Sequence, residues 1–213
     1  METHSVFKTP NHPSFVNLVL PGSHPESVDN SDLTLGIVKR IVNDHFRVAQ
    51  VGLALHGDVI EIANLQGAGP TSRYALSGLD PKRTFAQFEK ILGIKPLNTL
   101  LAIAILFSKQ RGEFRKIICD TGKKEAHLNY STVLQALKFR PAPECKDQLE
   151  LGLDIDESKL LERVIGKSDE KRESFDKIQA TFRPHLHRVF DQYLESDFYR
   201  SKHRPHTQLN AEI

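Results

Sequence analysis

The stretch FRVAQVGLALHGDVIEIANL, residues 46–65, decides the fold of this chain. Its two halves alternate apolar with small or polar residues, and His56-Gly57-Asp58 separates them. Alternation with a period of two is typical of a β-strand, and a short glycine-containing break between two such runs predicts a hairpin. Gly57 allows the positive φ that a tight turn needs. We expect His56, at this turn, to be solvated.

The residues on either side of the hairpin predict both helices and strands. Upstream, residues 31–42 carry apolar side chains at helical spacing, which predicts a helix. Downstream, residues 99–111 predict a helix that Asn98 caps and Gly112 ends. That helix is apolar almost all round, so we expect it to be buried on several sides across the sheet. The other predicted elements are a helix over 84–92, a strand over 114–120 and a helix over 125–137.

This order of elements is typical of an α/β (or α+β) layer protein. We expect residues 1–30 to form a loose N-terminal arm in which only 15–20 makes a strand. Residues 31–153 would form the α/β core. Residues 154–213 would form a helical C-terminal extension, in which residues 175–199 are a candidate surface for a protein partner.

Composition excludes several classes of function. The 213 residues are 39% hydrophobic and 26% charged, which is normal for a globular protein with a real core. The 29 basic and 27 acidic side chains are well mixed, so bulk charge gives no support for a nucleic-acid partner. The longest apolar run, residues 100–107, is far shorter than the roughly 20 residues that span a bilayer. We therefore expect no membrane span, and without a signal-peptide pattern we expect a cytoplasmic protein.

The thiols and imidazoles do not predict a metal or disulfide site. Cys119 and Cys145 are the only cysteines, and two thiols in a chain of this size do not make a disulfide scaffold. Ten histidines are present, but none stands at a ligand spacing beside a cysteine or a fixed carboxylate. We expect both cysteines to be buried or idle thiols and expect no metal.

The second strand of the hairpin runs directly into Gln66-Gly67-Ala68-Gly69-Pro70-Thr71. Later, the segment Leu134–Arg140 closes a helix with a Phe-Arg pair. These two features resemble the core of the GNAT superfamily of acyl-CoA-dependent N-acyltransferases. That superfamily typically has a Gln/Arg-x-x-Gly-x-Gly/Ala loop after a central strand and a late helix that ends in a Gly-Phe-Arg-like turn. The resemblance implies a mixed central sheet flanked by helices, with two middle strands that splay apart.

The resemblance also implies roles for particular residues. Gln66, Gly67, Ala68 and Gly69 would hold the diphosphate of an acyl-CoA on their main-chain amides, and Arg73 would add a fork of donors. The donor would be a coenzyme A or carrier-protein thioester, and the acceptor a small-molecule or protein amine.

Two further residues would act on protons in this reading. Glu61, on the preceding strand, would take the proton from the amine. Tyr130 would protonate the leaving thiolate. Glu61 equally suits an outward-facing charge on an amphipathic strand, and Tyr130 a half-buried helix residue.

A second resemblance favours a different function. The Leu65-Gln66-Gly67 junction and the segment Leu76–Arg83 are similar to the VirK/YbjX family of bacterial proteins, which is associated with virulence and envelope stress. This implies a non-catalytic protein that binds a partner on the same scaffold. Pro70 supports this alternative, because proline lacks the N–H donor that a phosphate would use. A third alternative is an interaction module made by the C-terminal helices.

Overall fold

A computed structural model describes residues 2–7, 14–19, 31–41, 44–67, 86, 89–90, 93–120 and 130–202. Side chains are described for most of these from residue 31 onward. The strands are β1 Glu2–Phe7, β2 Ser14–Val19, β3 Leu33–Ile41, β4 Asp44–His56, β5 Val59–Gly67, β6 Lys116–Asp120, β7 Arg140–Ala142 and β8 Cys145–Gly152. The helices are α3 Pro96–Arg111, α4 Tyr130–Ala136, α5 Glu157–Ile165, α6 Asp169–Glu195 and α7 Asp197–Lys202.

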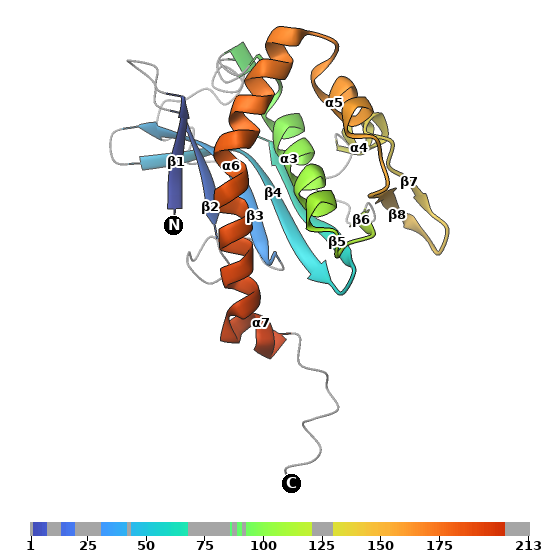
Figure 1. Cartoon of the computed structure of the whole chain (residues 1–213). Helices are drawn as coiled ribbons and strands as arrows, with labels where there is room; N and C mark the ends of the chain where they lie inside the picture. The colour runs from blue at the N-terminus through green and yellow to red at the C-terminus, as the bar shows by residue number, and fades with distance from the viewer. Residues whose placement is uncertain are drawn as a thin grey trace.

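The strands form one mixed sheet in the order β1-β2-β3-β4-β5-β6-β8-β7. All neighbours are antiparallel except β5 and β6, which are parallel and are connected through α3. Figure 1 shows α6, α3 and α5 side by side on one face of this sheet. The prediction of an α/β protein with a mixed central sheet flanked by helices is therefore confirmed.

The predicted hairpin is present as β4 and β5. The pairing runs from His56 opposite Val59 to Ala49 opposite Gly67. Gly57 has a φ of 61°, the positive value that a two-residue II′ turn requires at its first central position. The alternation also has its expected cause, since Leu53, Leu55 and the other alternate apolar residues of β4 are buried under α3.

The helix predicted over residues 31–42 is wrong, because this segment is strand β3. Leu33, Leu35 and Ile37 are buried at alternate positions, and they pack in the core between the neighbouring strands and α3. The same segment satisfies both periods, since apolar residues are so frequent in it that helical and strand spacing overlap. Asp32 does not cap a helix. Its carboxyl group accepts hydrogen bonds from the Leu55 amide at 2.7 Å and from the Tyr193 hydroxyl at 2.5 Å.

Helix α3 confirms the prediction of a helix buried on several sides. Every residue from Thr99 to Ser108 is buried, and the helix packs on β3, β4 and β5 and against α5 and α6. It begins earlier than predicted, with Lys95 as its cap and Pro96 at its first turn, so Asn98 is not the cap. Gly112 ends it with a φ of 73°, as predicted.

Part of the predicted N-terminal arm belongs to the sheet. The strand expected over 15–20 is present as β2, which pairs with β3, and β1 pairs with β2 in turn. Strands β7 and β8 were also not predicted. β8 buries only Leu149 and Leu151 and otherwise carries polar residues, so its sequence has little apolar alternation to detect.

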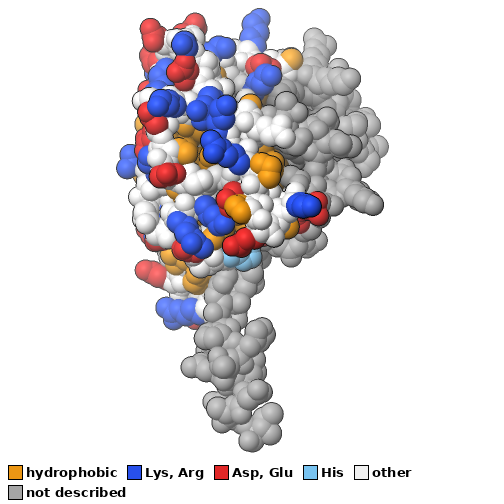
Figure 2. Space-filling view, turned by 90° about the vertical axis from the view of Figure 1, so that its right-hand side faces the viewer, with side chains coloured by type: hydrophobic (Ala, Val, Ile, Leu, Met, Phe, Trp, Pro, Cys, Tyr) orange, Lys and Arg blue, Asp and Glu red, His pale blue; other side chains and the backbone are white. Residues whose placement is uncertain are grey.

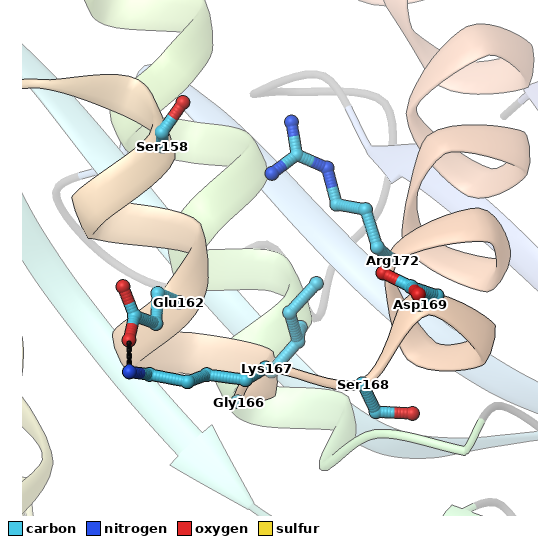
Figure 3. Close-up of a pocket in the computed structure, with 8 residues that line it drawn as sticks. Ser158, Glu162, Gly166, Lys167, Ser168, Asp169 and Arg172 are labelled. Carbon is cyan, nitrogen blue, oxygen red and sulfur yellow. Dashed lines mark ion pairs between the residues drawn. The ribbon is translucent and has the colours of Figure 1, made fainter.

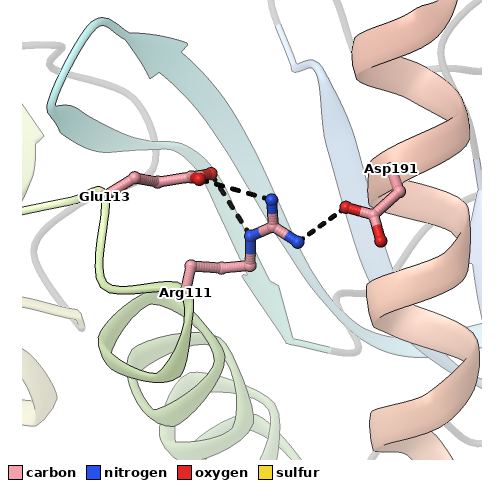
Figure 4. A network of polar contacts seen from close by, with 3 residues as sticks. All are labelled: Arg111, Glu113 and Asp191. Atoms are coloured by element: carbon pink, nitrogen blue, oxygen red, sulfur yellow. Dashed lines mark hydrogen bonds and ion pairs between the residues drawn. The ribbon is translucent and has the colours of Figure 1, made fainter.

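The C-terminal extension shares the core of the sheet. Phe175, Phe190 and most other apolar residues of α6 are buried in the same cluster as α3 and the central strands. Arg111, at the end of α3, donates a hydrogen bond to Asp191 of α6 at 2.6 Å and also forms an ion pair with Glu113 (Figure 4). These charged groups link α3 to α6 at the surface. The apolar side of α6 therefore packs in this chain's own core, and most of its exposed residues are polar.

Candidate functional site

The candidate site lies where strands β5 and β6 stop pairing. The two strands pair at three successive positions, and the last pair is Glu61 opposite Ile118. Beyond that pair, β5 continues to Gly67 and β6 to Asp120. Among the described strands none pairs with residues 62–67 on the side away from β4, which we call the open side of β5. This divergence agrees with the predicted splay of two middle strands.

A β-bulge lies at the same point in β5. Leu53 of β4 is opposite Ile62, whereas the next residue, Gly52, is opposite Asn64. Ala63 is therefore an extra residue in β5. A bulge bends its strand and increases the local twist. It accounts for the departure of β5 from β6 directly after Glu61.

Gly52, opposite the residue that follows the bulge, leaves room for two neighbouring side chains. A Cβ atom at residue 52 would lie 2.2 Å from Oγ of Ser31 and 3.1 Å from Cβ of Asn64. Both side chains cover the backbone of β4 at this position, so only glycine fits. Nearby, the side-chain amide of the buried Gln50 donates a hydrogen bond from Nε2 to Oδ1 of Asn64 at 3.1 Å. The bulge is thus held by specific packing and a cross-strand hydrogen bond.

The main chain of β5 supplies donors to its open side. In an antiparallel ladder, successive residues direct their N–H and C=O groups alternately toward the two sides of the strand. Since residues 62–67 stay paired with β4, about every second N–H among them faces the open side. Gln66 and Gly67, two of the predicted cradle residues, are the last residues of β5. The other three, Ala68, Gly69 and Arg73, lie outside the described residues.

Glu61 is the last residue of β5 that pairs with β6. Its side chain is 25% exposed, and its Oε2 atom lies 2.9 Å from Nε2 of His56. The burial alternates along β5, with Ile60 and Ile62 in the core, so Glu61 is on the face of the sheet opposite α3. It is therefore a partly shielded carboxyl group at the vertex of the diverging strands.

The nearest thiol to this carboxyl group is that of Cys119. Burial raises the pKa of Cys119 to about 12, and the negative charges of Glu61 and Asp120 act in the same direction. At neutral pH the thiol stays protonated, and a protonated thiol is a poor nucleophile. Cys119 is thus a buried thiol, as predicted, whereas Cys145 is exposed at the start of β8.

Tyr130 is the first residue of α4, the helix that follows β6. Its side chain lies outside the described part of the chain, and its role stays a prediction. The end of α4 is described. The amide of Phe139 bonds the Leu134 carbonyl at 3.0 Å, and Lys138 has a left-handed φ of 71°. This is the Schellman ending, in which glycine is preferred, and it matches the Gly-Phe-Arg-like turn with lysine in the glycine's place.

A surface hollow lies between the end of α5 and the start of α6. It has a volume of about 290 Å³ and is wide open, and Ser158 and Arg172 point toward each other across it (Figure 3). Glu162 and Lys167 at its edge form an ion pair of 3.0 Å. Arg172 is itself paired with Asp176 at 3.3 Å. None of the residues predicted to act lies there.

The described surface and helices add two observations. Figure 2 shows basic and acidic side chains interspersed over the described part of the visible face, without a large area of one sign. In the described ranges, no three His, Cys, Asp or Glu side chains are grouped closely enough to hold a metal ion. Within the same ranges, no helix combines the length and the apolar character needed to cross a bilayer.

His56 was not predicted as a partner of Glu61. Residues 56 and 59 flank a two-residue turn, and residues 54 and 61 are opposite each other. His56 and Glu61 are therefore diagonal neighbours on one face, within reach of long side chains. The hairpin register, once predicted, contained this signal.

Comparison with known families finds no family that matches the chain, and comparison with curated proteins finds no match. A solved structure of a cAMP-binding acyltransferase from Mycobacterium smegmatis, a mutant form, is similar over 84% of this chain, with a TM-score of 0.41 and 9% identity. The chain spans 56% of the length of that protein. At this level of similarity we assign the chain to no family, and we infer its function from its own geometry.

Proposed function

We propose that this protein transfers an acyl group from a coenzyme A or carrier-protein thioester to an amine. The observation that carries the proposal is the end of the β5–β6 ladder at Glu61, where both strands continue. A thioester cofactor of this kind has a chain of amide groups and, in coenzyme A, a diphosphate. Main-chain N–H groups in a gap between two strands suit both, because they offer aligned donors without a charged side chain.

The residues divide the chemistry as follows. Glu61 takes a proton from the ammonium group of the acceptor, and the resulting amine attacks the thioester carbonyl. The C–N bond forms, the C–S bond breaks, and Tyr130 gives its proton to the leaving thiolate. The nitrogen then loses its second proton, which returns to the Tyr130 oxygen. Main-chain donors on the open side of β5 stabilise the negative charge that develops on the carbonyl oxygen. Gln66, Gly67, Ala68, Gly69 and Arg73 hold the diphosphate.

The state of Cys119 favours direct transfer to the amine. An acyl-enzyme route through Cys119 requires its thiolate, and burial keeps this thiol protonated at neutral pH. Direct transfer in turn requires a base for the amine, since an ammonium group has no lone pair with which to attack. Glu61 is the carboxyl group placed at the vertex.

Binding is tested first, by thermal-shift titration with coenzyme A and acetyl-CoA. At about 100 times the Kd, we expect the midpoint to rise by about 5–10 °C, because the ligand binds only the folded chain. Gly69→Glu should abolish the shift, since a carboxylate there repels phosphate. Ala180→Glu, which adds the same charge at an exposed position of α6, should keep it. An acylated carrier protein tests the other donor. If no donor shifts the midpoint, the proposed acyl transfer is wrong, and the alternative of a non-catalytic protein that binds a partner is favoured.

Catalysis is tested with Glu61→Gln, which keeps the size and the hydrogen-bonding capacity of the side chain. Acyl transfer to a panel of amines should fall by about 10²–10⁴-fold in kcat, the usual contribution of a general base. The thermal shift with acetyl-CoA should remain. Full activity in this variant would remove Glu61 from the mechanism.

A further inference from the structure

The contact between His56 and Glu61 is a hydrogen bond that fixes one carboxylate oxygen and leaves the other without a donor in the described part of the chain. Oε2 of Glu61 is 2.9 Å from Nε2 of His56, and these two atoms belong to the two arms of one hairpin. An ionised carboxyl group only accepts hydrogen bonds, so the imidazole must carry its hydrogen on Nε2 in this contact. Among the described residues, no donor contacts the other oxygen, Oε1.

The two side chains also differ in exposure. The His56 side chain is 55% exposed, whereas that of Glu61 is 25% exposed. His56 is at the hairpin end of β4, and the divergence of β5 from β6 begins at Glu61 and runs the other way. The imidazole therefore holds Glu61 from the side opposite to the gap, and it does not obstruct the gap.

We propose that His56 is a positioning residue, which fixes the Glu61 carboxylate through Oε2 and leaves Oε1 as the atom that accepts the proton of the amine. This inference rests on the proposed function. An unrestrained glutamate on a strand has several rotamers of similar energy, and most of them direct the carboxylate away from a given substrate atom. A hydrogen bond to one oxygen selects among them. A misplacement of about 1 Å at a reacting group can cost about 10²-fold in rate.

A purely structural role for His56 predicts a different outcome. A pair this exposed adds little to stability, because solvent screens the charges. A second exposed ion pair, at the turn of the same hairpin, serves for comparison. Arg115 and Asp58 form an ion pair of 2.7 Å with exposures of 68% and 53%, at the turn itself and away from Glu61. Breaking either pair should therefore leave the fold intact.

The test compares three single variants in steady-state transfer assays: His56→Ala, His56→Gln and, as the matched control, Arg115→Ala. His56→Ala should lower kcat by about tenfold or more and leave KM for the acyl donor and the amine within about twofold. Glutamine keeps an N–H donor at a similar reach, so His56→Gln should recover most of the loss. Arg115→Ala should behave as the unmodified protein.

A double variant completes the test. If His56 acts through Glu61, then His56→Ala should have no further effect on kcat in the Glu61→Gln background. Equal kcat in the His56→Ala variant and the unmodified protein would overturn the inference and leave the proposed function standing. A multiplicative loss in the double variant would overturn it as well. If the unmodified protein binds acetyl-CoA but transfers no acyl group to any amine, the proposed function fails and this inference fails with it.

Discussion

The two sides of strand β5 differ in what they do. Toward β4, the strand is paired along its whole length, from the turn at His56 to Gly67, and this ladder is part of the core under α3. Toward β6, it is paired at three positions and then has no strand partner in the described part of the chain. The paired side stabilises the fold, and the unpaired side is the one that we propose binds the acyl donor. The bulge at Ala63 lies at the boundary between the part of β5 that pairs with both neighbours and the part that pairs with β4 alone.

The largest effect on stability should come from filling the space that Gly52 leaves for its neighbours. In Gly52→Val, the new side chain would overlap the Ser31 hydroxyl, whose oxygen lies 2.2 Å from the Cβ position. We expect the free energy of unfolding to fall by about 3 kcal/mol, as in an overpacked core, and the acetyl-CoA shift to be lost. Chemical denaturation measures the first and thermal shift the second. The double variant Gly52→Ala with Ser31→Gly should recover part of the stability. Unchanged stability in Gly52→Val would contradict the close packing of Ser31 and Asn64 on Gly52.

A smaller loss should follow from a change on the paired side alone. Tyr193→Phe removes the hydrogen bond to the buried Asp32, which also binds the backbone of β4. The loss of one hydrogen bond to a buried carboxyl group costs about 1–3 kcal/mol. Denaturant titration should show that loss, whereas acetyl-CoA affinity at a temperature where the variant is folded should be unchanged. A weakened affinity would show that the two sides of β5 are coupled.

A pH-dependent effect should come from the helix layer, at a distance from β5. Burial lowers the pKa of His187 below its usual value of 6.5, and the positive charges of Arg111 and Arg183 add to this, whereas Asp191 opposes it. The folded state therefore favours the neutral ring. Its contribution to stability is present above pH 6.5 and is lost as the pH falls through the lowered pKa.

This effect can be isolated with His187→Phe, which preserves an aromatic ring against Phe107. Between pH 7.5 and pH 5.0, the unmodified protein should lose more thermal stability than the variant. If the two proteins lose equal thermal stability between these pH values, then groups other than His187 cause the loss.

The smallest effect should be a gain in stability. Lys138 adopts a left-handed φ of 71° at the end of α4, where glycine has no steric penalty. Lys138→Gly should raise the free energy of unfolding by about 0.5–1 kcal/mol, without a change in ligand binding. Lys146→Gly, at an exposed strand position of β8, should not raise it, since glycine is unfavourable in a strand. A loss of stability in Lys138→Gly would contradict this account of the turn.

The parts of the fold that depend on neighbours in sequence were predictable. The β4–β5 hairpin follows from alternation and a glycine turn, and α3 follows from an apolar run that ends at Gly112. β3 was mistaken for a helix, because its apolar residues satisfy both periods and only the sheet on either side selects the strand. β8 escaped prediction because only Leu149 and Leu151 of its residues are buried.

The site was predictable to a lesser degree. The position of Glu61 on the strand before the glycine-rich loop came from the family resemblance, and its place at the last parallel pair came from the structure. The bulge at Ala63 was not predictable, since an extra residue in a ladder is visible only when both strands are aligned. His56 could have been paired with Glu61 from the register of the predicted hairpin.

The central claim is that the open side of β5 binds an acyl-CoA through its main chain. Residue-resolved amide NMR during a titration with coenzyme A tests it most directly. Saturable shifts should be concentrated in residues 62–67 and extend to Glu61 at the vertex, with alternate amides changing most. Amides that stay unchanged there while coenzyme A is saturating, or shifts confined to the hollow around Ser158 and Arg172, would contradict it.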